Sequence, residues 1–201
     1  MTLKKVKAVK DGIKKDKILK AATALFSKSG YAQTSIRDIT RKSKVSIGLL
    51  YFYYKNKKDI LKAIFMRLKP VFSDLHNEHK EKHSFAEYFR LLGKSLIDFS
   101  VSNLGFNLLL LNESMKDREL SNFFYEQFKT EISIIAQKFS EYSDRENLRK
   151  VDCEKIAISL VSTTYSLAVF NRVFKDNFNS DFLDNMLENI VDVSINGLVQ
   201  K

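Results

Sequence analysis

The sequence predicts an all-α protein of about nine helices, and two observations support that class. Only 6 of the 201 residues are Gly and only 1 is Pro, whereas a β-rich chain of this length needs many turns, which use these residues. Apolar residues recur at helical spacing along most of the chain, and Lys, Leu, Phe and Ile are abundant. Apolar residues make up 44% of the chain, which is enough for a substantial core and excludes a wholly disordered protein.

The composition also predicts the cellular compartment. There is one Cys, so no internal disulfide can form and a reducing compartment fits best. The longest uncharged stretch, residues 156–171, is rich in Ser and Thr and shorter than the roughly 20 apolar residues of a membrane-spanning helix. The N-terminal lysines are followed by no apolar run of the kind found in signal peptides. We therefore expect a cytoplasmic protein with no membrane partner.

Charge is distributed unevenly along the chain. Residues 1–70 contain 19 Lys or Arg and 4 Asp, a net charge of +15, whereas residues 71–201 contain 15 basic and 20 acidic residues, a net charge of −5. The basic third predicts contact with phosphates or with anionic lipid, and the acidic remainder predicts a separate task. For residues 1–17 the alternative is a solvated lysine-rich leader in a chain that is rich in Lys, Asn, Ile and Phe.

The first helix is predicted from apolar residues at helical spacing, namely Ile18, Ala21, Ala22, Leu25 and Phe26. Asp16 is the candidate start, and Gly30 is a natural stop in left-handed geometry.

Two short helices are predicted after it. Ser35 followed by Asp38 resembles a capping box, which opens a second helix that ends near Lys42. Ser46 is an N-cap candidate for a third helix that ends near Tyr53. Two short helices joined by a tight turn form a helix-turn-helix.

Six further helices are expected. The fourth helix begins after Asn56, and Pro70 should end or kink it. The fifth begins after Ser84 and ends near Asn103, and the sixth spans 106–115 beyond Gly105. The seventh spans 120–142, the eighth begins at Asp152 and ends near Phe174, and the ninth begins at Asp181 and ends near Val199. We divide the chain into a basic leader (1–12), a helix-turn-helix domain (13–58) and a helical ligand-binding and dimerisation domain (59–201).

The stretch from Lys17 to Phe65 resembles the DNA-binding domain of the TetR family of bacterial repressors. The resemblance rests on an ordered series of residues: Ile18-Leu19-Lys20-Ala21-Ala22, Leu25-Phe26, Gly30-Tyr31, Thr34-Ser35-Ile36, Ile39, Val45-Ser46, Gly48, Leu50-Tyr51, Tyr53-Tyr54-Lys55-Asn56-Lys57 and Leu61. It implies a ligand-responsive regulator, most simply a repressor, that binds a near-palindromic operator as a dimer and is released by a small apolar or amphipathic ligand.

The DNA-binding residues that the resemblance and the chemistry suggest lie on the second and third helices and at the start of the fourth. They are Thr34, Ser35, Arg37, Ser46, Ile47, Gly48, Leu49, Tyr51, Tyr53, Lys55 and Lys57. The tyrosine hydroxyls and the lysines can bind phosphate, and the start of a helix favours an anion.

Several alternatives stay open for these residues. Thr34 and Ser35 can serve only as caps. Gly48 either allows close approach to the DNA backbone or packs between helices. Lys55 and Lys58 either contact phosphate or are merely solvated.

Other residues near the turn have different expectations. Leu50 and Tyr54 are assigned mainly to packing. The family usually has Gly where Lys44 stands, so Lys44 must adopt a less favourable backbone conformation or the turn differs. Ile47 and Leu49 can touch thymine methyl groups but cannot form bidentate hydrogen bonds, so specificity should depend on Arg37, Ser46 and DNA shape.

In the acidic remainder, the resemblance implies a dimer formed by the last two helices and a pocket for an unknown small-molecule effector. The apolar candidates for the pocket are Phe89, Phe106, Leu110, Phe124, Phe128, Tyr165 and Phe170; for each of them, membership of the core is the alternative. We expect no cofactor.

Other functions have less support in the sequence. His76, His79 and His83 fall near one helical face, but a closed zinc site wants four ligands, so a solvated helix end is the preferred interpretation and no metal is expected. Cys153 is expected to be an inert thiol. An enzyme would need a nucleophile with a base, or a metal cluster, and no such constellation is apparent. A membrane-surface protein would leave the helix-turn-helix unexplained.

Overall fold

The computed structural model describes the backbone of residues 3–68, 83–179 and 181–198, and side chains within these ranges from Asp11 to Gly197. Over these residues the chain forms nine helices and no strand, which confirms the all-α class and the expected helix count. The chain divides into two compact units.

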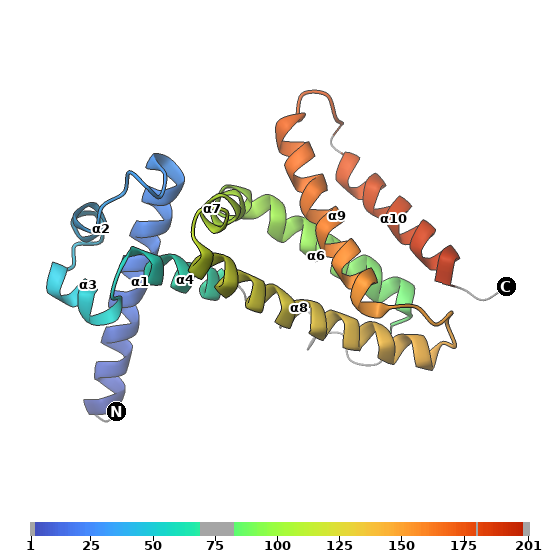
Figure 1. The fold of residues 1–201 in the computed structure, drawn as a ribbon, viewed down its shortest axis with the longest axis horizontal. Coiled ribbons are helices and arrows are strands. Elements are labelled where there is room, and N and C mark those ends of the chain that lie inside the picture. Colours follow the sequence, from blue (N-terminus) through green and yellow to red (C-terminus); the bar gives the residue numbers. More distant parts are fainter. Residues whose placement is uncertain (1–2, 69–82, 180, 199–201) are drawn as a thin grey trace. The chain divides into compact units, whose positions relative to one another are not determined.

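The first unit contains the N-terminal helices together with α7 and the first turns of α8 (Figure 1). Its helices are α1 (Leu3–Ser29), α2 (Ile36–Ser43), α3 (Ile47–Tyr53), α4 (Lys57–Leu68) and α7 (Leu104–Ser114). Helix α8 (Arg118–Arg145) begins in this unit and continues into the second. Helix α1 packs against α2 and α4, and α2 packs against α3. The side chains buried in these N-terminal helices include Ile18, Ala22, Phe26, Ile39, Ile60, Leu61 and Ile64.

Helix α1 begins at Leu3, so the predicted start at Asp16 is wrong. The Asp16 carboxylate instead pairs with Lys20 (3.0 Å) and with Arg67 of α4 (2.5 Å). Residues 3–15 contain no Pro, and Lys, Val and Ala are all compatible with a helix. The predicted end is confirmed: Gly30 follows the helix with φ of +82°.

The predicted caps of the helix-turn-helix are confirmed. The Asp38 N–H donates to the Ser35 hydroxyl (3.2 Å) and the Ser35 N–H donates to the Asp38 carboxylate (3.1 Å), which is the capping box of α2. The Ser46 hydroxyl accepts the N–H of Leu49 (3.2 Å) and thereby caps α3. Lys44 in the turn has φ 57° and ψ 37°, so of the two alternatives for this position the less favourable, left-handed backbone is the one found.

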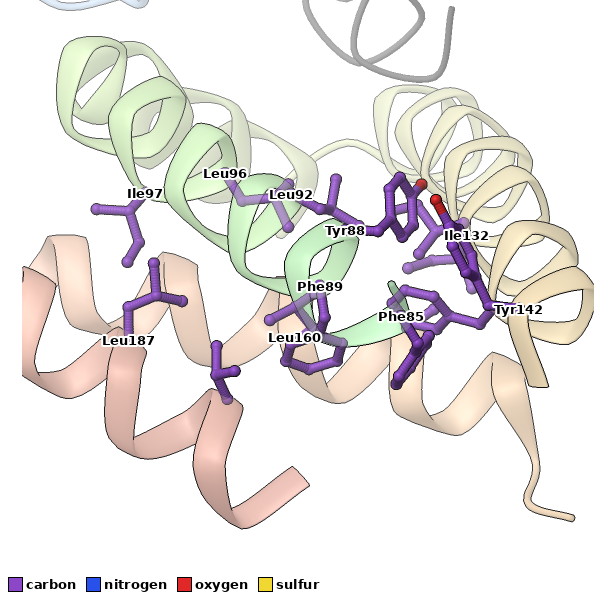
Figure 2. Packing of buried hydrophobic residues seen from close by; sticks show 14 of the residues in the cluster. Phe85, Tyr88, Phe89, Leu92, Leu96, Ile97, Ile132, Tyr142, Leu160 and Leu187 are labelled. Atoms are coloured by element: carbon purple, nitrogen blue, oxygen red, sulfur yellow. The ribbon is translucent and has the colours of Figure 1, made fainter. Parts of the chain in front are cut away.

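The second unit contains α6 (Phe85–Ser102), the remainder of α8, α9 (Cys153–Val173) and α10 (Phe182–Leu198). Helix α6 packs against both α9 and α10, which also pack against each other. Figure 2 shows the aromatic part of its core, where Tyr88 stacks on Tyr142 with ring centroids 5.0 Å apart. Gly93 brings α6 close to α10, because a Cβ there would lie 2.5 Å from Leu187 Cδ1.

The helix boundaries after residue 83 follow the prediction with one exception. Ser84 caps α6 and Asp152 caps α9, as expected. The break that was predicted at Gly105 lies at Asn103 instead, and Gly105 is inside α7. Asn103 is the C-cap of α6, where its side-chain amide (2.9 Å) and its own N–H (3.0 Å) both donate to the Phe99 carbonyl.

Three residues of the sequence analysis, Pro70, His76 and His79, lie outside the described residues.

Helix α9 is long and apolar enough by composition to span a membrane. It also packs against α6 and α10 and buries Leu160 and Leu167.

Candidate DNA-binding site

Helix α3 is anchored on one face and exposed on the others. Leu50 is fully buried and Tyr54 is 8% exposed, which confirms their assignment to packing. On the other faces the exposed fractions are 47% for Ile47, 50% for Tyr51 and 77% for Phe52. This arrangement packs one face of the short helix against the protein and leaves its other side chains exposed to a partner.

At the start of α2 the three candidate residues have different surroundings. Thr34 is buried and its hydroxyl donates to the Gly30 carbonyl (2.8 Å). The Ser35 hydroxyl donates to the Asp38 carboxylate (2.5 Å), which lowers the pKa of Asp38. Arg37, in contrast, is exposed. Arg37 is therefore the candidate of the three that best fits a side-chain contact with a partner.

Gly48 does not pack between helices. Among the described residues, no atom lies within 4 Å of the position that a Cβ would occupy at Gly48, apart from its own helix and chain neighbours. The packing alternative for this glycine is therefore not supported, and close approach of a partner to the α3 backbone stays a prediction.

The two candidate tyrosines of α3 are not equivalent. The Tyr53 hydroxyl donates to the Asp11 carboxylate of α1 (2.8 Å), and this hydrogen bond raises the pKa of Tyr53. The Lys15 ammonium lies 5.3 Å from the centre of the Tyr53 ring. Tyr51 has a side chain that is half exposed. Tyr53 thus ties α3 to α1, and Tyr51 is the better candidate for a phosphate contact.

Lys57, at the first position of α4, points its ammonium into the protein. The ammonium donates to the carbonyls of Tyr31 (2.5 Å), Thr34 (2.9 Å) and Ala32 (3.3 Å) and lies 4.2 Å from the centre of the Tyr31 ring. Burial lowers the pKa of Lys57 and raises the pKa of Tyr31 to about 12. The Lys57 ammonium therefore fixes the α1–α2 connection, while its backbone N–H lies in the first turn of α4, where N–H groups favour an anion.

The lysines that flank Lys57 also differ. Lys55 is exposed, and its N–H donates to the Asp59 carboxylate (3.1 Å). The Lys58 ammonium forms ion pairs with Asp117 (2.7 Å) and Glu119 (2.8 Å), so Lys58 is not merely solvated.

Sequence reasoning missed two features of this surface. The helical pattern gave no sign that Asp11 would hold Tyr53, because the two residues are 42 positions apart. Phe52 was not chosen, although it is the most exposed aromatic side chain of α3. Its position two residues after the buried Leu50 in a short helix could have placed it on the outer face.

Comparisons with known proteins agree with this geometry. Residues 18–64 match the sequence model of the bacterial regulatory proteins, tetR family. These residues form a domain of the tetR family.

Relatives match the chain over different lengths. The transcriptional regulator HbdR of Aromatoleum is 45% identical over 65 residues, which are 32% of this chain and 27% of HbdR. IcaR, a negative regulator of the biofilm operon icaADBC in Staphylococcus aureus, is 24% identical over 166 residues, which are 80% of this chain and 87% of IcaR. The chain thus spans about a quarter of HbdR but most of IcaR.

A solved structure extends the likeness of the fold to nearly the whole chain. The transcriptional regulator FadR from Bacillus subtilis, in complex with stearoyl-CoA, superposes with a TM-score of 0.73 at 18% identity. The match covers 90% of this chain and 97% of FadR. The chain therefore shares the two-part helical fold of these regulators.

The seven pocket candidates do not all belong to one unit. Phe106 and Leu110 are in the first unit, and both are buried. Phe89 is part of the core of the second unit, where its ring stacks on Phe139 at 5.6 Å. The remaining four lie in the second unit as well, with Phe128 and Phe170 exposed and with Phe124 and Tyr165 half-buried.

Two observations bear on the chemistry of the second unit. The Tyr165 hydroxyl is buried, and no partner for it lies among the described residues; burial raises its pKa. Burial also raises the pKa of Cys153, which keeps it a thiol at neutral pH. In the described ranges no three potential His, Cys, Asp or Glu ligands come together.

A groove of about 340 Å³ runs between α9 and α10. Small or apolar side chains line it, among them Ser159, Thr163, Val193, Ser194 and Gly197. Val193 is 73% exposed. Of the seven pocket candidates, this groove includes Phe89 alone.

Proposed function

We propose that this TetR-family chain is a ligand-responsive repressor that binds a near-palindromic DNA operator as a homodimer and is released by a small apolar or amphipathic molecule. The observation that carries the proposal is helix α3, which is held by the buried Leu50 and Tyr54 while Ile47 and Tyr51 remain exposed. A recognition helix must fit the major groove in this way. Phosphate contacts at the start of α4 would fix its orientation.

Base recognition is assigned to few side chains. Arg37 is exposed on α2 and offers the geometry for bidentate hydrogen bonds to guanine. Ile47 and the half-buried Leu49 offer apolar contact to thymine methyl groups. The proposal therefore places specificity on Arg37, Ser46 and DNA shape, with Gly48 allowing close approach.

The homodimer is assigned to α9 and α10. The groove between them is lined by small residues, and the exposed side chain of Val193 lies beside it. Small residues permit close approach of helices, and an exposed apolar surface favours association. A dimer formed here leaves one DNA-reading unit on each protomer, which is what a near-palindrome requires.

The ligand is assigned to the second part of the chain, residues 59–201. The candidates there are aromatic and aliphatic with few charges, which favours an apolar or amphipathic molecule. FadR, which has a similar fold, was solved in complex with stearoyl-CoA, an amphipathic molecule. This supports an apolar or amphipathic ligand for the present chain. We assign no cofactor and no catalytic role to the protein and place it in the cytoplasm. Residues 1–12 are assigned as a basic leader and residues 13–58 as the DNA-binding domain.

DNA binding can be tested before any operator is known. The protein should bind a random-sequence duplex with an affinity that falls steeply with salt, because phosphate contacts release counterions. It should bind vesicles of anionic lipid far less. Binding to vesicles but not to duplex DNA would replace the regulator by a membrane-surface protein that uses the basic leader.

The ligand response is tested by linkage. A compound that lowers the affinity for DNA by a given factor must itself bind the DNA-bound protein more weakly than the free protein, by that same factor. A thermal-shift screen of apolar and amphipathic molecules would supply compounds to test. Equal affinity for both forms would leave a constitutive DNA-binding dimer as the better description.

A further inference from the structure

Four charged side chains meet in the first unit, on α4 and at the start of α8. Lys58 and Lys62 lie one turn apart on α4, and Asp117 and Glu119 lie at the N-terminus of α8. The Lys58 ammonium is 2.7 Å from Asp117 and 2.8 Å from Glu119, and the Lys62 ammonium is 2.5 Å from Glu119. We call these four residues the α4–α8 charge cluster.

Asp117 of the cluster is held by backbone N–H groups. Asp117 Oδ1 accepts the N–H groups of Glu119 (3.0 Å) and Leu120 (3.1 Å), so Asp117 also caps α8. The hydrogen bonds to Asp117 and Glu119 raise the pKa of Lys58, and those from Lys58 lower the pKa of both acids. These shifts favour the charged forms of Lys58, Asp117 and Glu119 at neutral pH.

Lys58 stands where a DNA phosphate is expected. It is the second residue of α4, in the turn whose backbone N–H groups favour an anion. The neighbouring Lys57 ammonium is directed inward onto the carbonyls of Tyr31, Ala32 and Thr34. The two lysines that flank Lys57 are Lys55, which is exposed, and Lys58, which is bound to two carboxylates.

We propose that Lys58 is a phosphate-binding residue that Asp117 and Glu119 hold away from DNA, so that the start of α8 acts as an autoinhibitory contact. The two carboxylates offer Lys58 the anionic oxygens that a phosphate would offer. The Lys58 and Asp117 side chains are about one-third exposed, and ion pairs with that much solvent access are weak enough to exchange partners. The proposal rests on the proposed DNA-binding function.

The size of the effect follows from counterion release. One additional phosphate contact makes the slope of log affinity against log salt steeper by about 0.9. Extrapolated from 1 M salt, one contact corresponds to a gain of about fifteenfold at 50 mM salt and about fourfold at 200 mM. The gain itself should thus shrink by a factor of about 3.5 over that range.

The test uses the full-length protein carrying Asp117→Asn together with Glu119→Gln. Asn keeps the oxygen that caps α8, so the fold should be retained, and this is checked by a thermal melt. Affinity for a random-sequence duplex is measured by fluorescence anisotropy between 50 and 200 mM salt. We expect tighter binding and the steeper slope.

The control variants decide whether Lys58 is responsible. Adding Lys58→Ala to the double variant should abolish the gain, whereas adding Lys62→Ala should preserve it. Lys62 is the matched control because it also pairs with Glu119 but lies one turn further from the start of α4.

Three outcomes would overturn the inference. The first is a gain that survives Lys58→Ala, which would reflect only the loss of two negative charges. The second is an unchanged slope of log affinity against log salt. The third is weaker binding by the double variant, which would mean that the two acids merely hold α4 in place. A wild-type protein that fails to bind duplex DNA would instead refute the proposed function itself.

Discussion

Replacing Gly48 by Ala should raise the stability of the protein and weaken its binding to DNA. Gly48 lies inside α3, and in the free protein a Cβ there would meet no described atom within 4 Å beyond its own helix and neighbours. Because Ala loses less backbone entropy than Gly in a helix, the free energy of unfolding should increase by roughly 0.5–1 kcal/mol.

The effect on DNA has the opposite sign. If the α3 backbone approaches the DNA closely at Gly48, an added methyl group must push the two surfaces apart. Overpacking by a methyl group typically costs about 1–3 kcal/mol, which corresponds to roughly 5- to 150-fold weaker binding. Urea unfolding and anisotropy titration with a duplex measure the two effects on the same preparation.

Gly12→Ala is the matched control for this prediction. Gly12 is also inside a helix, and no described atom lies within 4 Å of its Cβ position. It should show the same gain in stability with no loss of DNA affinity. A Gly48→Ala variant that is less stable than wild type would mean that α3 packs differently, and unchanged DNA affinity would refute the close approach.

Three further outcomes are expected. Lys44→Gly should stabilise the protein by about 0.5–1 kcal/mol in urea unfolding, because Lys44 has φ 57° and Gly adopts this conformation without a steric cost; a loss of stability would show that the lysine side chain contributes more than its backbone costs. Tyr51→Phe should weaken binding to all duplex sequences alike, whereas Tyr53→Phe should have a smaller effect on DNA because its hydroxyl is already bound within the protein; the reverse ranking in a titration would exchange their roles. The pKa of Asp38 is lowered by its hydrogen bonds with Ser35, so the contribution of this capping box is complete above pH 3.8, the usual value, and is lost as the pH falls through the lowered value. Acid unfolding of Asp38→Asn should lack that component, and an identical acid transition would contradict it.

The parts of the fold that could be predicted depend on contacts between close neighbours in the sequence. The caps formed by Ser35, Ser46 and Ser84 each join residues three positions apart, so the sequence alone locates the helix starts. The left-handed conformation of Lys44 was predictable for the same reason, since it is imposed by a tight turn between two short helices.

The parts that could not be predicted depend on partners far away in the sequence. Asp16 has the composition of a helix start, but its carboxylate is bound to Arg67, which is 51 positions further on. Lys57 was expected to face phosphate, yet its ammonium binds carbonyls 23 to 26 positions earlier. A local pattern gives the chemistry of such a side chain but not its partner, because the partner is set by how the helices pack.

The same distinction applies to the acidic part of the chain. Apolar residues at helical spacing predicted helices correctly, but they did not separate core from surface: Phe89 is buried in the core, whereas Phe170 is half exposed. A helix with apolar residues on several faces gives no single face from which burial can be derived. The assignment of pocket residues therefore stays a prediction.

A selection of bound sequences from a pool of random DNA duplexes tests the central claim most directly, namely that α3 reads DNA as one half of a dimer. The wild-type protein should enrich sequences with dyad symmetry whose half-site centres lie about 34–36 Å apart, one turn of duplex, because two identical recognition helices enter successive major grooves. The Arg37→Ala variant should enrich a degenerate version of the same site, with about 1–3 kcal/mol less discrimination at the affected base pair. Enriched sequences without dyad symmetry would contradict the dimeric DNA reader, and an Arg37→Ala selection identical to that of the wild type would contradict the assignment of base recognition to Arg37.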